Sequence, residues 1–171
     1  GKTIAIIGTG RIGLAMIKKC SGFDMNILCY DPAYHNDQYV AAIQELMDLR
    51  HAKGIQSEKT FIKYVEFEEA LSGADYVSIH VPLLREGETD KPTYHLINDK
   101  TLRLMKPTAY LVNSSRGPVV DEKALIQAAE SEDPVTRYFA AYALGFWKGD
   151  AKQDRQIEAA LARLASDDGR G

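Results

Sequence analysis

Three glycines near the start of the sequence have the spacing of a turn that binds phosphate. The segment Gly8-Thr9-Gly10-Arg11-Ile12-Gly13 fits the pattern G-x-G-x-x-G. In that pattern Gly8 permits a tight turn, Gly10 lets the backbone approach a pyrophosphate, and Gly13 lets a helix pack closely on a strand. The first N–H groups of the helix then face the anion. Because glycines are common in turns, the hexapeptide alone is weak evidence for phosphate binding. Its position relative to the predicted strands and helices is the stronger criterion.

The elements around this turn are those that a dinucleotide-binding fold requires. Thr3–Ile7 is a short apolar run that predicts a buried parallel strand, and residues 12–19 predict an apolar helix. A second strand is predicted over Asn26–Tyr30. Because the glycine pattern follows a strand and opens a helix, the sequence favours dinucleotide binding.

Asp31 follows the second predicted strand, 18 residues beyond Gly13. A carboxylate at this point can accept hydrogen bonds from the adenosine ribose hydroxyls and repels a 2′-phosphate, which favours NAD over NADP. The alternative is a turn-forming aspartate in front of Pro32, a common pairing. The register of Asp31 with the glycine pattern favours the ribose contact.

Predicted strands and helices alternate over the first 128 residues. Further strands are expected over 61–65, 76–81 and 109–113, and helices over 36–53, 67–71, 101–105 and from 121 onward. This alternation implies parallel strands with helices on both faces, in an α/β, doubly wound, Rossmann-type domain over residues 1–128. Residues 134–147 and 154–165 predict two helices without a further strand, so residues 129–171 are expected to form an appended helical hairpin.

Two segments that end the fourth and fifth predicted strands, together with four others, resemble a known family. The set consists of the glycine pattern, Tyr30-Asp31-Pro32, His80-Val81-Pro82-Leu83, His95-Leu96-Ile97-Asn98, Asn113-Ser114-Ser115-Arg116-Gly117 and Val119-Val120-Asp121-Glu122. In this order the motifs resemble the NAD-binding domain of D-isomer-specific 2-hydroxyacid dehydrogenases, from residue 1 to about 127. The resemblance implies reversible reduction of a small 2-oxo acid to a 2-hydroxy acid, with NADH as the hydride donor.

The resemblance also implies roles for individual residues. Arg11 and Ile12 meet the pyrophosphate through their backbone, Val81 and Pro82 lie near the adenine, and Asn113 and Ser114 belong to the cofactor site. Thr93 corresponds to a threonine of the family that contacts phosphate. Arg116 corresponds to the arginine that holds the substrate carboxylate and polarises its carbonyl, which a guanidinium can do in bidentate fashion. The alternative for Arg116 is a surface arginine before a turn glycine.

The sequence motifs include no group that could transfer the hydroxyl proton of the substrate. Such a reaction needs an acid/base, and the family uses a histidine of a Pro-His motif paired with a glutamate. This sequence has no Pro-His motif and no histidine after His95. His80 and His95 are expected to be positional, while His35 and His51 are expected to face solvent. We therefore expect a fragment with little or no dehydrogenase activity; the alternative is a non-catalytic NAD-binding or protein-interaction module.

The last 43 residues carry a second, weaker resemblance. Residues 133–145 resemble the first helix of a HEAT-like repeat in the short form of phycobilin-lyase-like proteins, and residues 154–164 correspond to its second helix. A single repeat cannot bury its own apolar face, so docking on the first domain or on another chain is expected. The alternative is an unrelated amphipathic hairpin that closes the edge of the sheet.

The composition excludes several other kinds of partner. The net charge of −3 gives no electrostatic case for binding nucleic acid or an anionic membrane. The two cysteines form no CxxC or Cys/His cluster, so we expect buried thiols and no metal site. Neither a signal peptide nor 18 consecutive apolar residues occur, which favours the cytoplasm. The expected partners are a small 2-oxo or 2-hydroxy acid and a protein contact, through a homodimer or through the hairpin.

Overall fold

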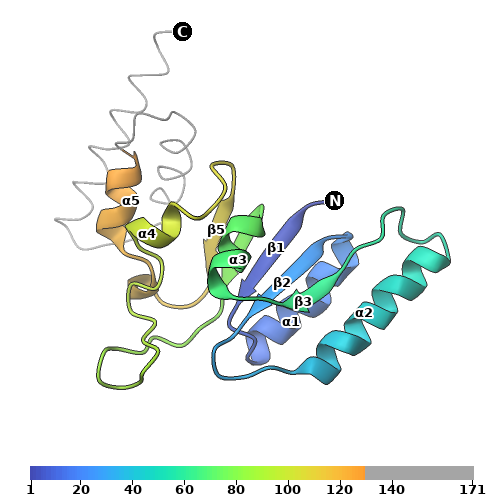
Figure 1. Cartoon of the computed structure of the whole chain (residues 1–171), viewed down its shortest axis with the longest axis horizontal. Coiled ribbons are helices and arrows are strands. Elements are labelled where there is room, and N and C mark those ends of the chain that lie inside the picture. Colours follow the sequence, from blue (N-terminus) through green and yellow to red (C-terminus); the bar gives the residue numbers. More distant parts are fainter. Residues whose placement is uncertain (130–171) are drawn as a thin grey trace, which may run out of the picture.

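The computed structural model describes residues 1–129, and their centre is a five-stranded parallel sheet (Figure 1). The strands are β1 (Thr3–Ile7), β2 (Asn26–Tyr30), β3 (Ile62–Tyr64), β4 (Tyr76–Ile79) and β5 (Tyr110–Asn113), in the order β3-β2-β1-β4-β5. The chain starts in the middle of the sheet, moves outward to β3, and then returns past β1 to β4. This order reverses direction between β1 and β4, which is where doubly wound sheets bind ligands at their carboxyl edge. The predicted fold class is confirmed.

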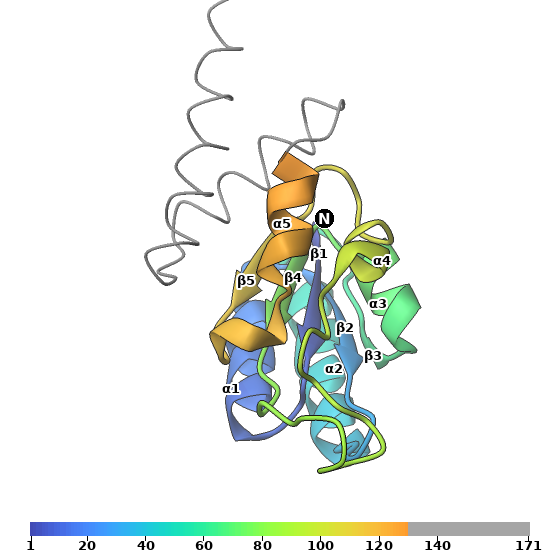
Figure 2. The same cartoon turned by 90° about the vertical axis from the view of Figure 1, so that its left-hand side faces the viewer.

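Helices cover both faces of the sheet. They are α1 (Arg11–Cys20), α2 (Asp37–Ala52), α3 (Phe67–Gly73), α4 (Asp99–Leu102) and α5 (Glu122–Ala129), with short 3₁₀ turns at Ser21–Phe23 and Gly117–Val119. Figure 2 shows α1 on one side of the sheet and α3 on the other. The predicted hairpin and HEAT-like repeat over residues 129–171 lie, from residue 130 onward, outside the described residues.

The apolar run of β1 serves two cores because successive side chains of a strand point to opposite faces. Ile4 and Ile6 pack with α1 and α2, whereas Ala5 and Ile7 pack with α3. The first of these cores also contains Cys29, whose burial raises the pKa of its thiol to about 12. Both cysteines are buried and free, as the sequence predicted.

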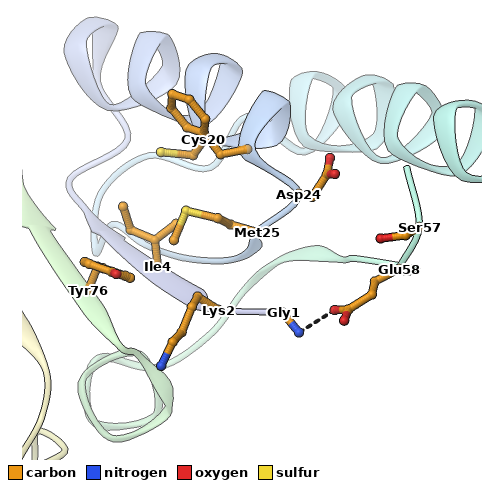
Figure 3. Close-up of a pocket in the computed structure, with 10 residues that line it drawn as sticks. Gly1, Lys2, Ile4, Cys20, Asp24, Met25, Ser57, Glu58 and Tyr76 are labelled. Atoms are coloured by element: carbon orange, nitrogen blue, oxygen red, sulfur yellow. Dashed lines mark ion pairs between the residues drawn. The ribbon is translucent and has the colours of Figure 1, made fainter. Parts of the chain in front are cut away.

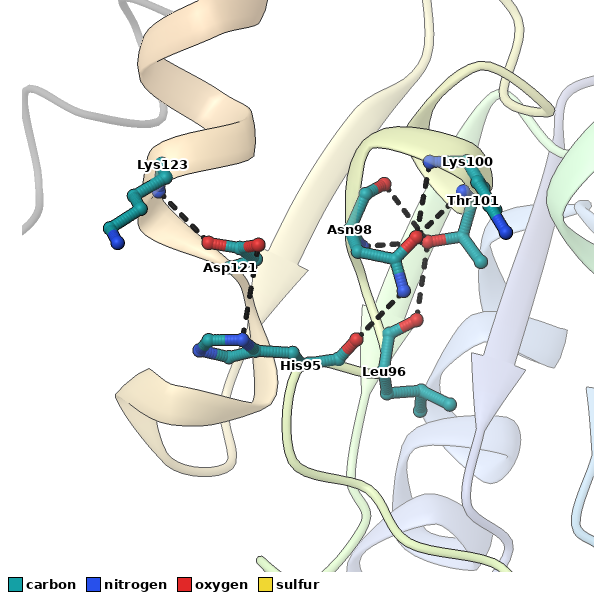
Figure 4. Close-up of polar contacts among 7 residues, drawn as sticks. All are labelled: His95, Leu96, Asn98, Lys100, Thr101, Asp121 and Lys123. Atoms are coloured by element: carbon teal, nitrogen blue, oxygen red, sulfur yellow. Dashed lines mark hydrogen bonds and ion pairs between the residues drawn. The ribbon is translucent and has the colours of Figure 1, made fainter.

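The expected helix over 101–105 begins two residues early, at Asp99. The reason is a cap that the sequence analysis missed (Figure 4): the Asn98 carboxamide oxygen accepts from the N–H groups of Lys100 and Thr101. In return the Thr101 hydroxyl accepts from the Asn98 N–H at 2.8 Å. Threonine here takes the place that glutamate or glutamine usually fills in a capping box.

Asp75, next to the start of β4, ties the amino ends of two strands together. Its Oδ2 accepts from the Thr3 N–H at 2.8 Å, and its Oδ1 lies 3.2 Å from Lys106 Nζ and 3.8 Å from Lys2 Nζ. The backbone hydrogen bond, followed by the lysine charges, lowers the pKa of this carboxyl. Its contribution to stability is therefore complete above the ordinary pKa of about 3.9 and is lost as the pH falls below it.

We expect Asp75→Asn to lower the free energy of unfolding at neutral pH by about 1 kcal/mol, and the deficit to shrink as the pH falls from neutral to below the ordinary pKa of about 3.9. Urea unfolding across this pH range measures both. The matched control is Asp99→Asn, which removes an exposed pair with Arg103 and should change stability by less than about 0.5 kcal/mol. A deficit at Asp75 that did not depend on pH would show that its charge is not the cause.

Candidate cofactor site

The glycine turn connects β1 to α1 and depends on two positions that tolerate no side chain. Gly8 has a φ of +93°, and a Cβ added there would lie 2.9 Å from the carbonyl of His80. A Cβ on Gly13 would lie only 2.0 Å from the carbonyl oxygen of Gly8. Helix α1 therefore starts in direct contact with the turn that precedes it. This is the close packing of helix and strand that the glycine at position 13 predicted.

Gly10 differs from these two because the space next to it is open. A Cβ added to Gly10 would meet no atom of residues 1–129 within 4 Å. Gly10 is also the N-cap of α1, where no side chain of the described residues caps the helix and no acidic residue occurs in the first turn. Arg11 and Ile12 are exposed at the same place. Uncapped N–H groups, a positive dipole end and open space together fit a phosphate group.

Asp31 lies against the glycine turn, as its register predicted. Its Oδ2 accepts from the Thr9 N–H at 2.8 Å, and its Oδ1 accepts from Ala33 and Tyr34 N–H groups at 3.0 Å each. Asp31 thus also forms the turn at Pro32, which was the alternative considered for it. Asp31 is therefore both a turn-forming aspartate and a carboxylate beside the glycine turn, because the same side chain makes both sets of contacts.

The residues that follow β4 and β5 lie next along the same edge of the sheet. Val81 is buried and contacts the turn: its Cγ1 would be 3.0 Å from a Cβ on Gly8. Pro82 is exposed beside it. Asn113 ends β5, which pairs with β4, and Ser114 comes next. The structure therefore brings these predicted residues to the carboxyl edge that also carries the glycine turn.

His80 joins the ends of β4 and β5 through two serines. The Ser114 hydroxyl lies 2.7 Å from Nδ1 and donates to the Ile79 carbonyl at 2.8 Å, so it can only accept from Nδ1–H. Nε2 then accepts from the Ser78 hydroxyl at 2.9 Å. Burial lowers the pKa of His80, which agrees with a neutral ring. Both ring nitrogens are thus engaged by serines at the ends of the two strands.

Arg116 lies in the loop after β5, and its side chain is exposed. The Asn113 carboxamide shapes this loop, because its Nδ2 donates to the Arg116 carbonyl and its Oδ1 accepts from the Ser115 N–H. The guanidinium donates to the Ser115 carbonyl at 3.1 Å. Within residues 1–129 it makes no ion pair, so its charge is available to an anion.

The family comparison decides what this edge of the sheet belongs to. Residues 1–136 match the model of the D-isomer specific 2-hydroxyacid dehydrogenase NAD binding domain. The chain belongs to this family. The domain is 42% identical over 128 residues to a glyoxylate reductase of Thermococcus litoralis, covering 75% of this chain and 31% of the relative. It thus spans about a third of the length of the curated relatives it matches.

Solved structures of D-2-hydroxyacid dehydrogenases have the same fold. The apo structure of Escherichia coli D-lactate dehydrogenase aligns with a TM-score of 0.59 at 32% identity, covering 76% of this chain and 33% of that one. An NAD-complexed dehydrogenase from Lactobacillus delbrueckii aligns with a TM-score of 0.56 at 32% identity, covering 75% and 31%. The cofactor of this NAD-binding domain is NAD, and the open start of α1 fits its pyrophosphate.

Two sequence-based expectations about side chains need correction or addition, and a third is confirmed. His51 does not face solvent: it is half-buried, and its Nδ1 lies 3.3 Å from the Gln56 carbonyl. Thr93 is buried, and its hydroxyl bonds the Pro82 carbonyl and the Leu84 N–H, so it closes a loop within this NAD-binding domain. His35 is exposed, as expected.

Two polar residues beside the glycine turn were missed. Thr9 is fully buried, although it stands between two glycines of the motif, and its hydroxyl accepts from the Tyr64 hydroxyl at 3.1 Å. The glycine pattern allows any residue at position 9. The sequence pattern therefore gives no sign that Thr9 takes part in the site, and only the burial of its hydroxyl indicates it.

A cavity of about 570 Å³ lies elsewhere in the NAD-binding domain (Figure 3). It is lined by Met25, which precedes β2, by Tyr76, which begins β4, and by Lys2 and Glu58. These are the amino ends of the strands, opposite to the edge that carries Gly8 and Asp31. Among the described residues, no group of three or more metal-ligating side chains occurs, and no helix is long and apolar enough to cross a membrane.

Proposed function

We propose that this chain is the cofactor-binding part of an NADH-dependent reductase of small 2-oxo acids, and that by itself it binds NADH with little or no turnover. When bound, the nicotinamide supplies the hydride. The observation that carries the proposal is the uncapped, open start of α1 beside the Asp31 carboxylate. Because the chain spans about a third of its relatives, the reaction and its substrate are part of the proposal.

The residues of the site take separate roles in this proposal. The turn and the first residues of α1 surround the pyrophosphate with backbone groups: Gly8, Gly10, Arg11, Ile12 and Gly13. Asp31 accepts from the hydroxyls of the adenosine ribose. Val81 and Pro82 lie against the adenine, and Asn113 and Ser114 complete the cofactor site on the side of β5. The common support is that all of them lie at one edge of the sheet, on both sides of the point where the strand order reverses.

Arg116 holds the carboxylate of the 2-oxo acid and polarises its carbonyl. Its exposure and its lack of an ion pair within residues 1–129 support this role. The two histidines nearest in sequence are engaged elsewhere: both ring nitrogens of His80 bond serines, and His95 Nδ1 lies 3.8 Å from Asp121 Oδ2. Neither is proposed as the acid/base, so the chain should bind a 2-oxo acid better than it reduces it.

We expect the chain to bind NADH with a dissociation constant in the micromolar range, measured by the change in NADH fluorescence. Arg116→Ala should leave that affinity within about twofold and weaken the binding of glyoxylate to the NADH complex by about tenfold or more. Arg103→Ala is the matched control, since Arg103 is an exposed arginine that pairs with Asp99.

Four outcomes would contradict parts of this proposal. No NADH binding by the unchanged chain would overturn it. Unchanged glyoxylate binding in Arg116→Ala would remove the substrate role. Steady oxidation of NADH by glyoxylate, hydroxypyruvate or pyruvate would show that the chain supplies its own acid/base, whereas NADH binding without glyoxylate binding would favour the non-catalytic module.

The proposal also divides the chain into the NAD-binding domain over residues 1–128 and a HEAT-like helical hairpin over residues 129–171. A protein contact, through the hairpin or through a second copy of the chain, is part of it. Exposed apolar side chains on β5, the last strand of the described sheet, support such a contact; Val112 is 51% exposed. Sedimentation of the full chain over a range of concentrations tests for self-association.

A further inference from the structure

The buried Thr9 hydroxyl belongs to a chain of hydrogen bonds with a fixed direction. Thr9 Oγ1 lies 3.0 Å from the Tyr34 carbonyl oxygen and 3.5 Å from Asp31 Oδ2; both of these oxygens can only accept, so the single hydroxyl proton of Thr9 points toward them and not toward Tyr64. The Tyr64 hydroxyl therefore donates to Thr9 at 3.1 Å. Tyr64 in turn accepts from the Asn36 N–H at 3.0 Å. Each hydroxyl both donates and accepts, which leaves neither unsatisfied.

This chain of hydrogen bonds crosses three neighbouring strands at their carboxyl ends. Tyr64 ends β3, Asn36 precedes α2 in the connection from β2, and Thr9 follows β1. The order β3-β2-β1 places the connection from β2 between the other two. The three contacts therefore hold the glycine turn and the start of α2 at a fixed distance from each other.

The Asp31 carboxylate lies in the middle of this arrangement. Three backbone N–H groups donate to it, from Thr9, Ala33 and Tyr34. With about four lone-pair positions on a carboxylate, these three donors take most of them and fix its orientation. Thr9 takes part in both sets of contacts, through its N–H to Asp31 and through its hydroxyl to Tyr34.

His35 holds the Tyr64 ring in place from its outer side. The two rings stack with centroids 4.0 Å apart and planes 11° from parallel. His35 Nε2 lies 3.0 Å from the Asp31 carbonyl oxygen and donates to it. The tyrosine ring is thus fixed at its hydroxyl and at its face, and both contacts lead back to residues that shape the Asp31 turn.

We propose that Tyr64 and Thr9 are positioning residues for the adenosine ribose of the bound dinucleotide, because they hold the Asp31 carboxylate and the glycine turn in a fixed relation. The inference rests on the proposed cofactor site. A carboxylate with a fixed orientation repels the 2′-phosphate of NADPH strongly, whereas a carboxylate that can rotate away repels it less. Tyr64 and Thr9 therefore set how well this site distinguishes NADH from NADPH, without touching the cofactor.

The test is Tyr64→Phe in the full chain, with NADH and NADPH titrated separately by fluorescence. We expect the dissociation constant for NADH to rise about five- to tenfold and the preference for NADH over NADPH to fall by a similar factor. Tyr39→Phe is the matched control. It removes another half-buried hydroxyl, which donates to the Leu14 carbonyl at 3.0 Å, and should leave the preference unchanged.

Thr9→Val, which keeps the branched shape and removes the hydroxyl, is the second variant and should shift the preference in the same direction. A lower melting temperature with an unchanged NADH preference in both variants would mean that the hydroxyls only stabilise the fold, and would overturn this inference alone. If the unchanged chain did not bind NADH, the proposed function would fall as well.

Discussion

Replacing Gly13 with alanine should destabilise the protein by roughly 3 kcal/mol or more. The added Cβ would lie 2.0 Å from the Gly8 carbonyl oxygen and 3.4 Å from Ile6 Cγ2, so either the turn or the helix has to move. Movement is costly because Gly8 is itself fixed: its N–H donates to the Tyr30 carbonyl at 2.8 Å. Alanine is otherwise the better helix former by about 1 kcal/mol, so the measured loss is the clash minus that gain.

Urea unfolding of the full chain measures this loss, and Gly22→Ala is its control. Gly22 lies in the 3₁₀ turn just after α1, and a Cβ there would meet no atom of the described part of the chain within 4 Å. The control should therefore remain within about 0.5 kcal/mol of the unchanged chain. If the free energy of unfolding of Gly13→Ala equalled that of the control, the glycine turn would be able to move away from α1 at little cost in free energy.

The sheet could be derived from the sequence because its strands are apolar on both faces. Thr3–Ile7 and Asn26–Tyr30 were predicted at their observed bounds, since both faces of a central parallel strand need apolar residues. The ends of shorter elements were less certain. The strand expected over 76–81 ends at Ile79, where the chain leaves the sheet to bring Val81 against the glycine turn.

The position of the candidate site could also be derived, because parallel strands bring distant turns to one edge. These residues are far apart in the sequence, but Gly8 and Asp31 follow β1 and β2, and Asn113 ends β5. The contacts that hold the site could not be derived in this way. Thr9 and Tyr64 meet because β3 pairs with β2 and a long side chain reaches past it, and neither residue type signals that meeting.

The three glycines of the motif therefore serve different purposes, although the sequence pattern treats them alike. Gly8 and Gly13 are required by the folded chain, since a side chain at either would meet backbone atoms. Gly10 is not, because the space beside it is open. A requirement for glycine at position 10 has to come from something that approaches the backbone from outside, which in this family is the dinucleotide.

Gly10→Ala should accordingly separate binding from stability. Gly10 has a φ of −67°, which alanine adopts without strain, so the free energy of unfolding should change by less than about 1 kcal/mol. The dissociation constant for NADH should rise by about tenfold or more, because the methyl group holds the pyrophosphate away from the first N–H groups of α1. Fluorescence titration and urea unfolding of the same preparation measure the two quantities, with Gly22→Ala again as the control.

If Gly10→Ala bound NADH as tightly as the control, the open space beside Gly10 would not be where the pyrophosphate lies, and the start of α1 would lose its assigned role. A loss of stability equal to that of Gly13→Ala would instead show that Gly10 is needed by the fold.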